Sequence, residues 1–277
     1  MLLKDKVVVI TGAASGIGKA LALGCAQRGA KLLLADIDAI GLRNIAGSLR
    51  EAGTACHECV TDTGDEAAIQ ALASECQRVY GAADVLINNA GVALVAPIDR
   101  ASTADAQWLM NINFWGVVHG CRAFLPQLRS RPEAVLVNIS SIFAMISMPT
   151  QGYYNASKAA VRAFSDALRE ELRDSTVRVL CVHPGGIKTN IANQARVVDL
   201  GGIASSPEQM RANFLQTAIT TPDEAARVIL GAIEQGRTRV LIGRDAKIAD
   251  LLYRFVPARA SQWITRLARR QQRRRAS

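Results

Sequence analysis

Short apolar runs and longer amphipathic stretches alternate along most of the chain. The runs are rich in β-branched residues, as in 6–11 (KVVVIT), which is typical of a strand buried on both faces of a parallel sheet. Between the runs, apolar residues recur at helical spacing, as at Val161, Phe164 and Leu168. The predicted strands are 6–11, 31–36, 54–60, 84–91, 134–141, 177–183 and 239–243. Strands that alternate with helices predict one α/β domain with a parallel sheet.

Composition agrees with a folded domain and places the charge unevenly. The 277 residues are 49% hydrophobic, which argues against disorder. The net charge is +9, but residues 237–277 alone hold 12 Arg or Lys against 2 Asp or Glu, so the remainder is near neutral. No apolar run reaches the roughly 18 residues that a transmembrane helix needs, and the first strand begins too early to leave room for a secretory signal. We therefore expect a cytoplasmic protein with a basic C-terminal extension.

The six cysteines are scattered through predicted helices and strands, and in a reducing compartment they are expected to be free thiols. The segment Cys56-His57-Glu58-Cys59 is similar to half of a zinc site. No second Cys/His pair lies at a suitable spacing, so no metal site is predicted.

A glycine-rich turn follows the first predicted strand and precedes a helical pattern. Glycine lets the backbone approach a phosphate closely, and the helix N-terminus supplies N–H groups and the positive end of a dipole. The context of strand, turn and helix therefore predicts phosphate binding. The spacing, Thr11-Gly12-x-x-x-Gly16-x-Gly18, resembles the cofactor motif of the short-chain dehydrogenase/reductase family.

The acidic residue Asp36 ends the second predicted strand about 20 residues after the glycine turn. A carboxylate there can accept hydrogen bonds from ribose hydroxyls and would repel a 2′-phosphate. Relatives that use NADP often carry Arg or Lys at the positions that are Ser15 and Ile37 in this chain. The cofactor is therefore predicted to be NAD.

The resemblance implies further cofactor contacts along the chain. Asp62 is the most ambiguous of them, because it could equally cap the helix that starts near Asp65. The implied cofactor-binding residues are Gly12, Ser15, Gly16, Ile17, Gly18, Asp36, Asp62, Thr63, Asn89, Ala90, Gly91, Tyr154, Lys158, Pro184, Gly185, Ile187 and Thr189. Asn88 is expected to be structural, with its side chain bonded to neighbouring strands.

The segment Tyr154-x-x-x-Lys158 is where the chemistry is expected. Residues four apart share one face of a helix, so the phenol and the ammonium can project into one site. A tyrosine has an ordinary pKa of about 10, and a nearby ammonium is expected to lower it, which suits general acid/base work.

The resemblance implies two more catalytic residues. Ser141 lies 13 residues before Tyr154, the family's spacing for the serine that holds the substrate oxygen, and Ser140 is expected to be structural. Asn113 occupies the position of the asparagine that bends a helix and holds a water in a proton relay. Asn111 is the alternative, but its spacing fits less well.

Two nearby residues are expected to lie outside the chemistry. Tyr153 cannot pair with Lys158 at a spacing of four and is expected in packing or in the pocket wall. His183, at a strand end before a proline, is expected to be structural.

Together these features predict a doubly wound Rossmann domain over residues 1–243, with a seven-stranded parallel sheet in the order 3-2-1-4-5-6-7. Residues 190–218 are expected to form a substrate lid with an apolar lining. The candidates for that lining are Ile191, Val197, Val198, Met210 and Phe214. At Phe143-Ala144, relatives commonly carry glycine at the second position, and the larger residues are expected to narrow the pocket.

The implied function is NAD-dependent interconversion of a hydrophobic secondary alcohol and its ketone by direct hydride transfer, in a homodimer or homotetramer without nucleic acid. The alternative is a non-catalytic protein that senses NAD(H) on the same scaffold. Residues 244–277 form a basic amphipathic extension, which could rest on an anionic membrane surface or pack on a partner subunit.

Overall fold

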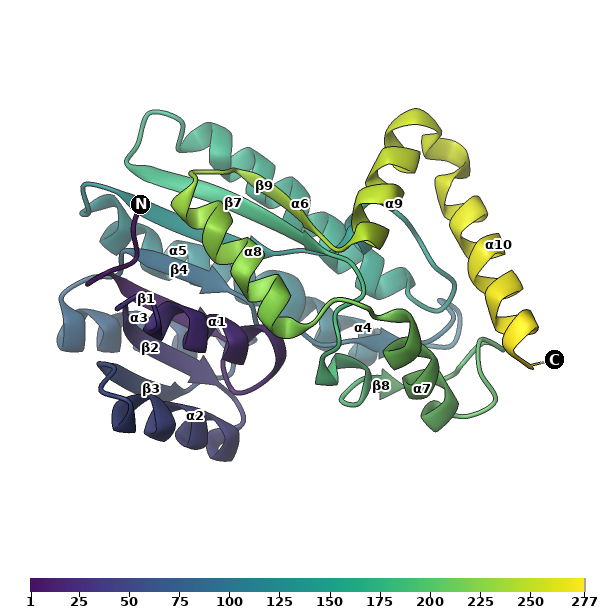
Figure 1. Cartoon of the computed structure of the whole chain (residues 1–277), viewed down its shortest axis with the longest axis horizontal. Helices are drawn as coiled ribbons and strands as arrows, with labels where there is room; N and C mark the ends of the chain where they lie inside the picture. The colour runs from purple at the N-terminus through teal and green to yellow at the C-terminus, as the bar shows by residue number, and fades with distance from the viewer. Residues whose placement is uncertain (277) are drawn as a thin grey trace.

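A parallel sheet forms the centre of the molecule (Figure 1). The computed structural model describes residues 1–276, and the side chains of residues 1–266. Within this range the main sheet has seven strands in the order β3-β2-β1-β4-β6-β7-β9, all paired in parallel. Their bounds are β1 Val7–Thr11, β2 Lys31–Asp36, β3 Cys56–Val60, β4 Val85–Asn88, β6 Ala134–Ile139, β7 Val177–Pro184 and β9 Arg239–Ile242. The predicted doubly wound fold and strand order are confirmed.

Helices cover both faces of this sheet, and the alternating side chains of the strands explain why. In β1, Val8 and Ile10 pack into one buried layer, while Val7 and Val9 pack into the other. The helices that contribute to the first layer are α1 Gly16–Ala26, α2 Ala39–Glu51 and α8 Pro222–Glu234. Those of the second layer are α3 Glu66–Tyr80, α5 Gly116–Arg129 and α6 Gly152–Glu171. Because all the strands are parallel, their carboxyl ends meet at one edge, where ligands of this fold bind.

A small second sheet lies beside that edge. It pairs β5 Leu94–Val95 with β8 Arg196–Val197, and the helices nearby in the chain are α4 Thr103–Met110 and α7 Pro207–Thr217. Arg196 forms an ion pair with Asp105 of α4 at 2.8 Å, and its guanidinium lies 3.8 Å from the ring centre of Trp108. The start of the predicted lid is therefore attached to the body of the domain.

The C-terminal extension folds into two helices, α9 Arg244–Phe255 and α10 Pro257–Ala276. Ala246 and Ala249 of α9 and Ala260 of α10 are buried in a cluster with Ile142 and Ile146. The carboxylate of buried Asp250 accepts hydrogen bonds from Arg239 at 2.5 Å and from Arg254 at 3.0 Å. The contact with Arg239 attaches α9 to the last strand. Over the described residues, the structure contains no helix whose length and apolar content would let it cross a membrane.

Candidate active site

The turn between β1 and α1 leaves no room for side chains at its glycines. Gly12 and Gly16 have φ angles of +66° and +53°. A Cβ on Gly18 would lie 1.9 Å from the carbonyl oxygen of Gly12, which is too close for any side chain. Ser15 is the N-cap residue of α1 and makes no side-chain capping bond, and Ile17 packs partly against the core. The backbone N–H groups at the start of α1 therefore open on a turn that a phosphate can approach.

The end of β4 holds this turn in place. The Asn89 side chain donates hydrogen bonds to the carbonyl oxygens of Thr11 and Gly12 at 2.9 and 3.0 Å. The Thr11 hydroxyl accepts from the backbone N–H groups of Asn89 and Ala90 at 3.0 and 3.1 Å. Asn88 instead donates to an asparagine side chain of β6 at 2.9 Å, in keeping with its predicted structural role. Asn89 thus shapes the glycine turn directly.

Asp36 ends β2 beside the same turn. One carboxylate oxygen accepts from the backbone N–H of Ala14 at 2.8 Å, and the other accepts from that of Asp38 at 3.0 Å. A carboxylate oxygen has more than one lone pair, so both can accept a further hydrogen bond. The carboxylate therefore both ties the turn to β2 and can face a ribose.

The end of β3 excludes one of the two roles considered for Asp62. Asp65 is the N-cap residue of α3 and accepts from the backbone N–H of Ala67 at 2.9 Å. Asp62 accepts from Gly64 N–H at 2.8 Å within the preceding turn, and Thr63 is buried. Asp62 is therefore not the helix cap.

Asn113 lies in a π-helical turn, Asn111–Trp115, between α4 and α5. Its side chain is fully buried and accepts from the N–H of Val92 at 2.8 Å. It donates to the Val92 carbonyl oxygen at 3.0 Å and to the Ser157 hydroxyl of α6 at 3.2 Å. Asn111 is exposed. The arrangement supports Asn113 over Asn111 as the residue of the site, and π-helical turns are frequent at functional positions.

Tyr154 and Lys158 lie on α6, facing the end of β6. The Ser141 side chain lies near enough to Tyr154 to lower the pKa of the phenol, and the Ser141 hydroxyl accepts from the Phe143 N–H at 3.1 Å. The Tyr154 ring packs edge-on against Phe143, with the ring centres 6.1 Å apart. The Lys158 ammonium lies 5.8 Å from the Tyr154 ring centre and donates to the Ile139 carbonyl oxygen at 3.1 Å. The structure therefore brings together the predicted serine, tyrosine and lysine.

The electrostatics of this group differ from the prediction. Burial raises the pKa of Tyr154 to about 12, although the hydrogen bond from Ser141 opposes the change. Burial also lowers the pKa of Lys158 to about 8. The prediction that the ammonium lowers the phenol's pKa is wrong for this structure, because burial dominates the pKa of Tyr154 and the ammonium donates to the Ile139 carbonyl oxygen.

Two close approaches join the remaining elements at the site. A Cβ on Gly91 would lie 3.3 Å from the Lys158 ammonium nitrogen and 3.2 Å from the Asn113 side-chain oxygen. A Cβ on Gly16 would lie 3.2 Å from a Thr189 side-chain carbon. The turn after β7 therefore meets the glycine turn, while the end of β4 meets the buried lysine.

The turn after β7 is held by a residue that the sequence did not single out. Pro184 ends β7, and the Gly186 N–H donates to the Asp245 carboxylate at 2.6 Å. A Cβ on Gly185 would lie 2.2 Å from that carboxylate, so the two groups are packed together. Ile187 is buried just beyond. No local pattern identifies Asp245, because its partner lies 59 residues away in the chain.

A hollow of about 650 Å³ lies between the segment 143–152, Ile98 and the face of α6 that carries Asn155, Ala156 and Ala159. None of the five residues predicted to line the substrate pocket from the lid lines this hollow. The prediction of a lid-derived lining is therefore not met at this hollow. Phe143 lines it and also packs against the Tyr154 ring, but Ser141, Tyr154 and Lys158 are not among its lining residues.

His183 is buried, with its Nδ1 atom 3.3 Å from the Ser141 carbonyl oxygen. Burial lowers its pKa to about 4, so the ring is neutral at physiological pH. Both observations agree with the predicted structural role.

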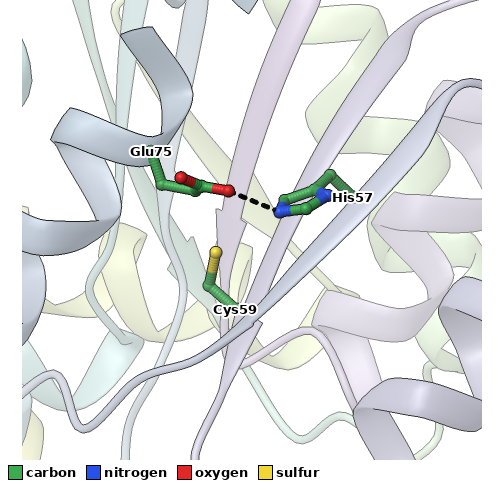
Figure 2. Close-up of side chains that lie close together, drawn as sticks. All are labelled: His57, Cys59 and Glu75. Carbon is green, nitrogen blue, oxygen red and sulfur yellow. Dashed lines mark ion pairs between the residues drawn. The ribbon is translucent and has the colours of Figure 1, made fainter. Parts of the chain in front are cut away.

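A second polar cluster joins His57 and Cys59 of β3 to Glu75 of α3, and their candidate ligand atoms lie within 4.8 Å of one another (Figure 2). The sequence did not identify Glu75. Its carboxylate pairs with the His57 ring at 2.8 Å and with Arg78 at 2.6 Å, and Arg78 lowers its pKa to about 2. Burial raises the pKa of the Cys59 thiol to about 11, which opposes metal binding. The polar groups of this cluster are therefore paired with one another and with Arg78 as an ion-pair network.

All six cysteines are free, as predicted.

Comparison with known proteins agrees with this architecture. A family profile described as short chain dehydrogenase matches residues 6–198. The chain is 39% identical to SadH of Mycobacterium tuberculosis over 257 residues, which cover 91% of each protein. It is 32% identical to dehydrogenase/reductase SDR family member 7B of Xenopus tropicalis over 246 residues, covering 87% of this chain and 78% of that protein. The chain belongs to the short-chain dehydrogenase family of oxidoreductases.

Solved structures place the chain among similar folds. A short-chain dehydrogenase/reductase from Burkholderia phymatum, in complex with NAD, has a TM-score of 0.82 and 30% identity, covering 92% of this chain and 96% of that one. A short-chain dehydrogenase from Streptomyces avermitilis has a TM-score of 0.79 and 26% identity, covering 99% of both chains. The site described above therefore lies on a scaffold that binds a nicotinamide cofactor.

Proposed function

We propose that this protein is an NAD-dependent oxidoreductase that interconverts a hydrophobic secondary alcohol and its ketone. The observation that carries the proposal is the convergence of Ser141, Tyr154 and Lys158 beside the glycine turn. This set would offer a substrate oxygen a proton donor and acceptor, a second hydroxyl and a nearby cation.

The residues at the carboxyl ends of the strands fit a dinucleotide. The glycine turn has no space for a Cβ at Gly12 or Gly18, so only glycine permits this tight turn. The N–H groups at the start of α1, just after the turn, would bind a pyrophosphate. Lys158 is only 3% exposed, and its ammonium has three N–H donors of which one goes to the Ile139 carbonyl. Ribose hydroxyls would supply acceptors for the other two, so Lys158 would hold the nicotinamide ribose.

Asp36 supports NAD rather than NADP. Its carboxylate lies at the end of β2 beside the glycine turn, where it would accept hydrogen bonds from the adenosine ribose. A 2′-phosphate would bring a second negative charge to the same place, and neither Ser15 nor Ile37 offers a cation to compensate. The NAD-bound relative from Burkholderia phymatum is consistent with this choice.

The chain's own residues would manage the proton. When bound, the nicotinamide would exchange a hydride with the substrate carbon. Tyr154 would give a proton to the substrate oxygen during reduction and remove one during oxidation, while Ser141 would hold that oxygen by a hydrogen bond. Asn113 would fix the segment at Val92 against α6, which keeps the lysine and the cofactor cleft in register.

The substrate is proposed to be apolar because a hollow with an apolar lining lies next to Phe143, whose ring packs against Tyr154. Ile98, Phe143, Met145, Met148 and Pro149 line it, together with small residues of α6. Such a lining favours a hydrophobic alcohol over a charged one.

The test compares the wild type with Tyr154→Phe. Each is given a panel of secondary alcohols, and turnover is measured as NADH formation. Removing the hydroxyl is expected to lower kcat by about 100-fold or more, the range for loss of a general acid/base. NAD binding should change little. Tyr153→Phe is the matched control, because the Tyr153 hydroxyl bonds to the Ile98 carbonyl at 3.2 Å, away from Ser141.

Near-normal activity of Tyr154→Phe would refute the assignment. NAD binding without turnover of any alcohol or ketone in the wild type would instead favour a protein that only senses the cofactor.

A further inference from the structure

The helices α9 and α10 form a hairpin at one end of the molecule (Figure 1). The inner face of α9 is buried through Ala246 and Ala249. Its outer side carries large apolar side chains instead: Ile248 is 60% exposed, Leu251 57% and Phe255 78%. Spacings of three and four residues place these side chains on one side of the helix, and Phe255 ends α9 at the bend.

The same hairpin carries a strong positive charge. From Leu251 onward the sequence contains eight arginines and no Asp or Glu. Arg254 and Arg259 are exposed on either side of the bend. Trp263, which is partly exposed, lies between Arg259 and Arg266 in α10. Exposed Phe, Leu and Trp side chains among arginines are the composition of helices that lie in the interface of a bilayer.

We propose that the hairpin α9–α10 is a docking surface for an anionic lipid bilayer. The apolar side chains of α9 and Trp263 would enter the region between headgroups and acyl chains, and the arginines would contact the acidic headgroups. The rest of the chain is nearly neutral, so the attraction is confined to this hairpin.

Charge complementarity favours an anionic bilayer over a second copy of the chain or a nucleic acid as the partner of this hairpin. A second copy that paired through the same surface would set arginines against arginines, which is unfavourable. A nucleic acid would satisfy the arginines, but its phosphate backbone would leave Leu251 and Phe255 without an apolar partner. An anionic bilayer satisfies both kinds of side chain.

The experiment is co-sedimentation of the full chain with phosphatidylcholine vesicles, with and without phosphatidylserine. The wild type is expected to bind only the vesicles that contain phosphatidylserine, and less as salt rises. The double variant Leu251→Gln/Phe255→Ser should bind about 100-fold more weakly, because each large apolar side chain is worth about tenfold or more. Ile40→Gln is the matched control, since Ile40 on α2 is 67% exposed and should not matter.

A second pair of substitutions tests the charge independently. Arg259→Gln/Arg266→Gln is expected to weaken binding roughly 30-fold, at about 1 kcal/mol for each arginine near the surface. This pair alters α10 alone, so it remains informative if the α9 variant does not fold.

Three results would overturn the proposal. These are no binding to phosphatidylserine vesicles, equal binding to neutral vesicles, or unchanged binding by both double variants. Sedimentation velocity identifies the main competitor: if wild type ignores vesicles and Leu251→Gln/Phe255→Ser breaks up an oligomer, the surface is a subunit contact.

Discussion

Lys158 is almost completely buried, and its ammonium donates to the Ile139 carbonyl oxygen. Burial lowers its pKa from 10.5 to about 8, which corresponds to about 3 kcal/mol of folding free energy at neutral pH. Replacing it by methionine removes this cost, but leaves the Ile139 carbonyl without its donor, at about 1–2 kcal/mol. We therefore expect Lys158→Met to be more stable than wild type by about 1–2 kcal/mol at pH 7, and to lose turnover.

The stability difference should depend on pH. The unfolded chain keeps Lys158 protonated until about pH 10.5, whereas the folded protein releases that proton near pH 8. Between these values the unfolded state binds more protons, so the stability of wild type rises with pH. The variant lacks this group, so the difference in free energy of unfolding between variant and wild type should shrink as the pH is raised from 7 to 10.

Urea unfolding of both proteins at pH 7 and pH 10 measures the effect, because the other titrating groups are common to both. Lys31→Met, at an exposed position of β2, serves as the control and should show no such change. A variant less stable than wild type at pH 7, or a difference that stays constant with pH, would refute the reasoning.

Three further outcomes are expected. Asp36→Ala should lower the ratio of kcat/KM for NAD to that for NADP by about tenfold or more, and an unchanged ratio would remove that role. Asn113→Ala loses the three hydrogen bonds of a fully buried side chain and should reduce the free energy of unfolding in urea by about 3 kcal/mol, whereas exposed Asn111→Ala should change it little. Gly18→Ala should abolish NADH binding measured by fluorescence, since its Cβ would meet a carbonyl oxygen at 1.9 Å. Gly47→Ala, with nothing within 4 Å, should bind NADH normally and gain up to about 1 kcal/mol.

The main sheet could be predicted because its strands are continuous apolar runs, such as 6–11, and because the turn after the first strand is rich in glycine. The small sheet of β5 and β8 could not, because each strand has two residues and shows no period. Its position depends instead on Arg196, whose partners Asp105 and Trp108 lie about 90 residues earlier.

The order of the candidate site residues could also be predicted, because their spacing in the chain is informative. Their electrostatics could not, since the pKa values of Tyr154 and Lys158 depend on burial, which no sequence pattern reports. For the same reason Glu75 and Asp245 were missed: each joins its cluster only through the tertiary fold.

The contact between Asp245 and Gly186 has a consequence for biosynthesis. Helix α9 is C-terminal to all seven strands of the main sheet, yet it supplies the acceptor that the turn after β7 needs. A nascent chain that has emerged from the ribosome only as far as β9 therefore has all seven strands of the main sheet, but the turn after β7 still lacks its contact with Asp245. Maturation of the enzyme should trail assembly of the sheet, and a nascent chain exposed only as far as Gly243 should be a folded but poorly competent intermediate.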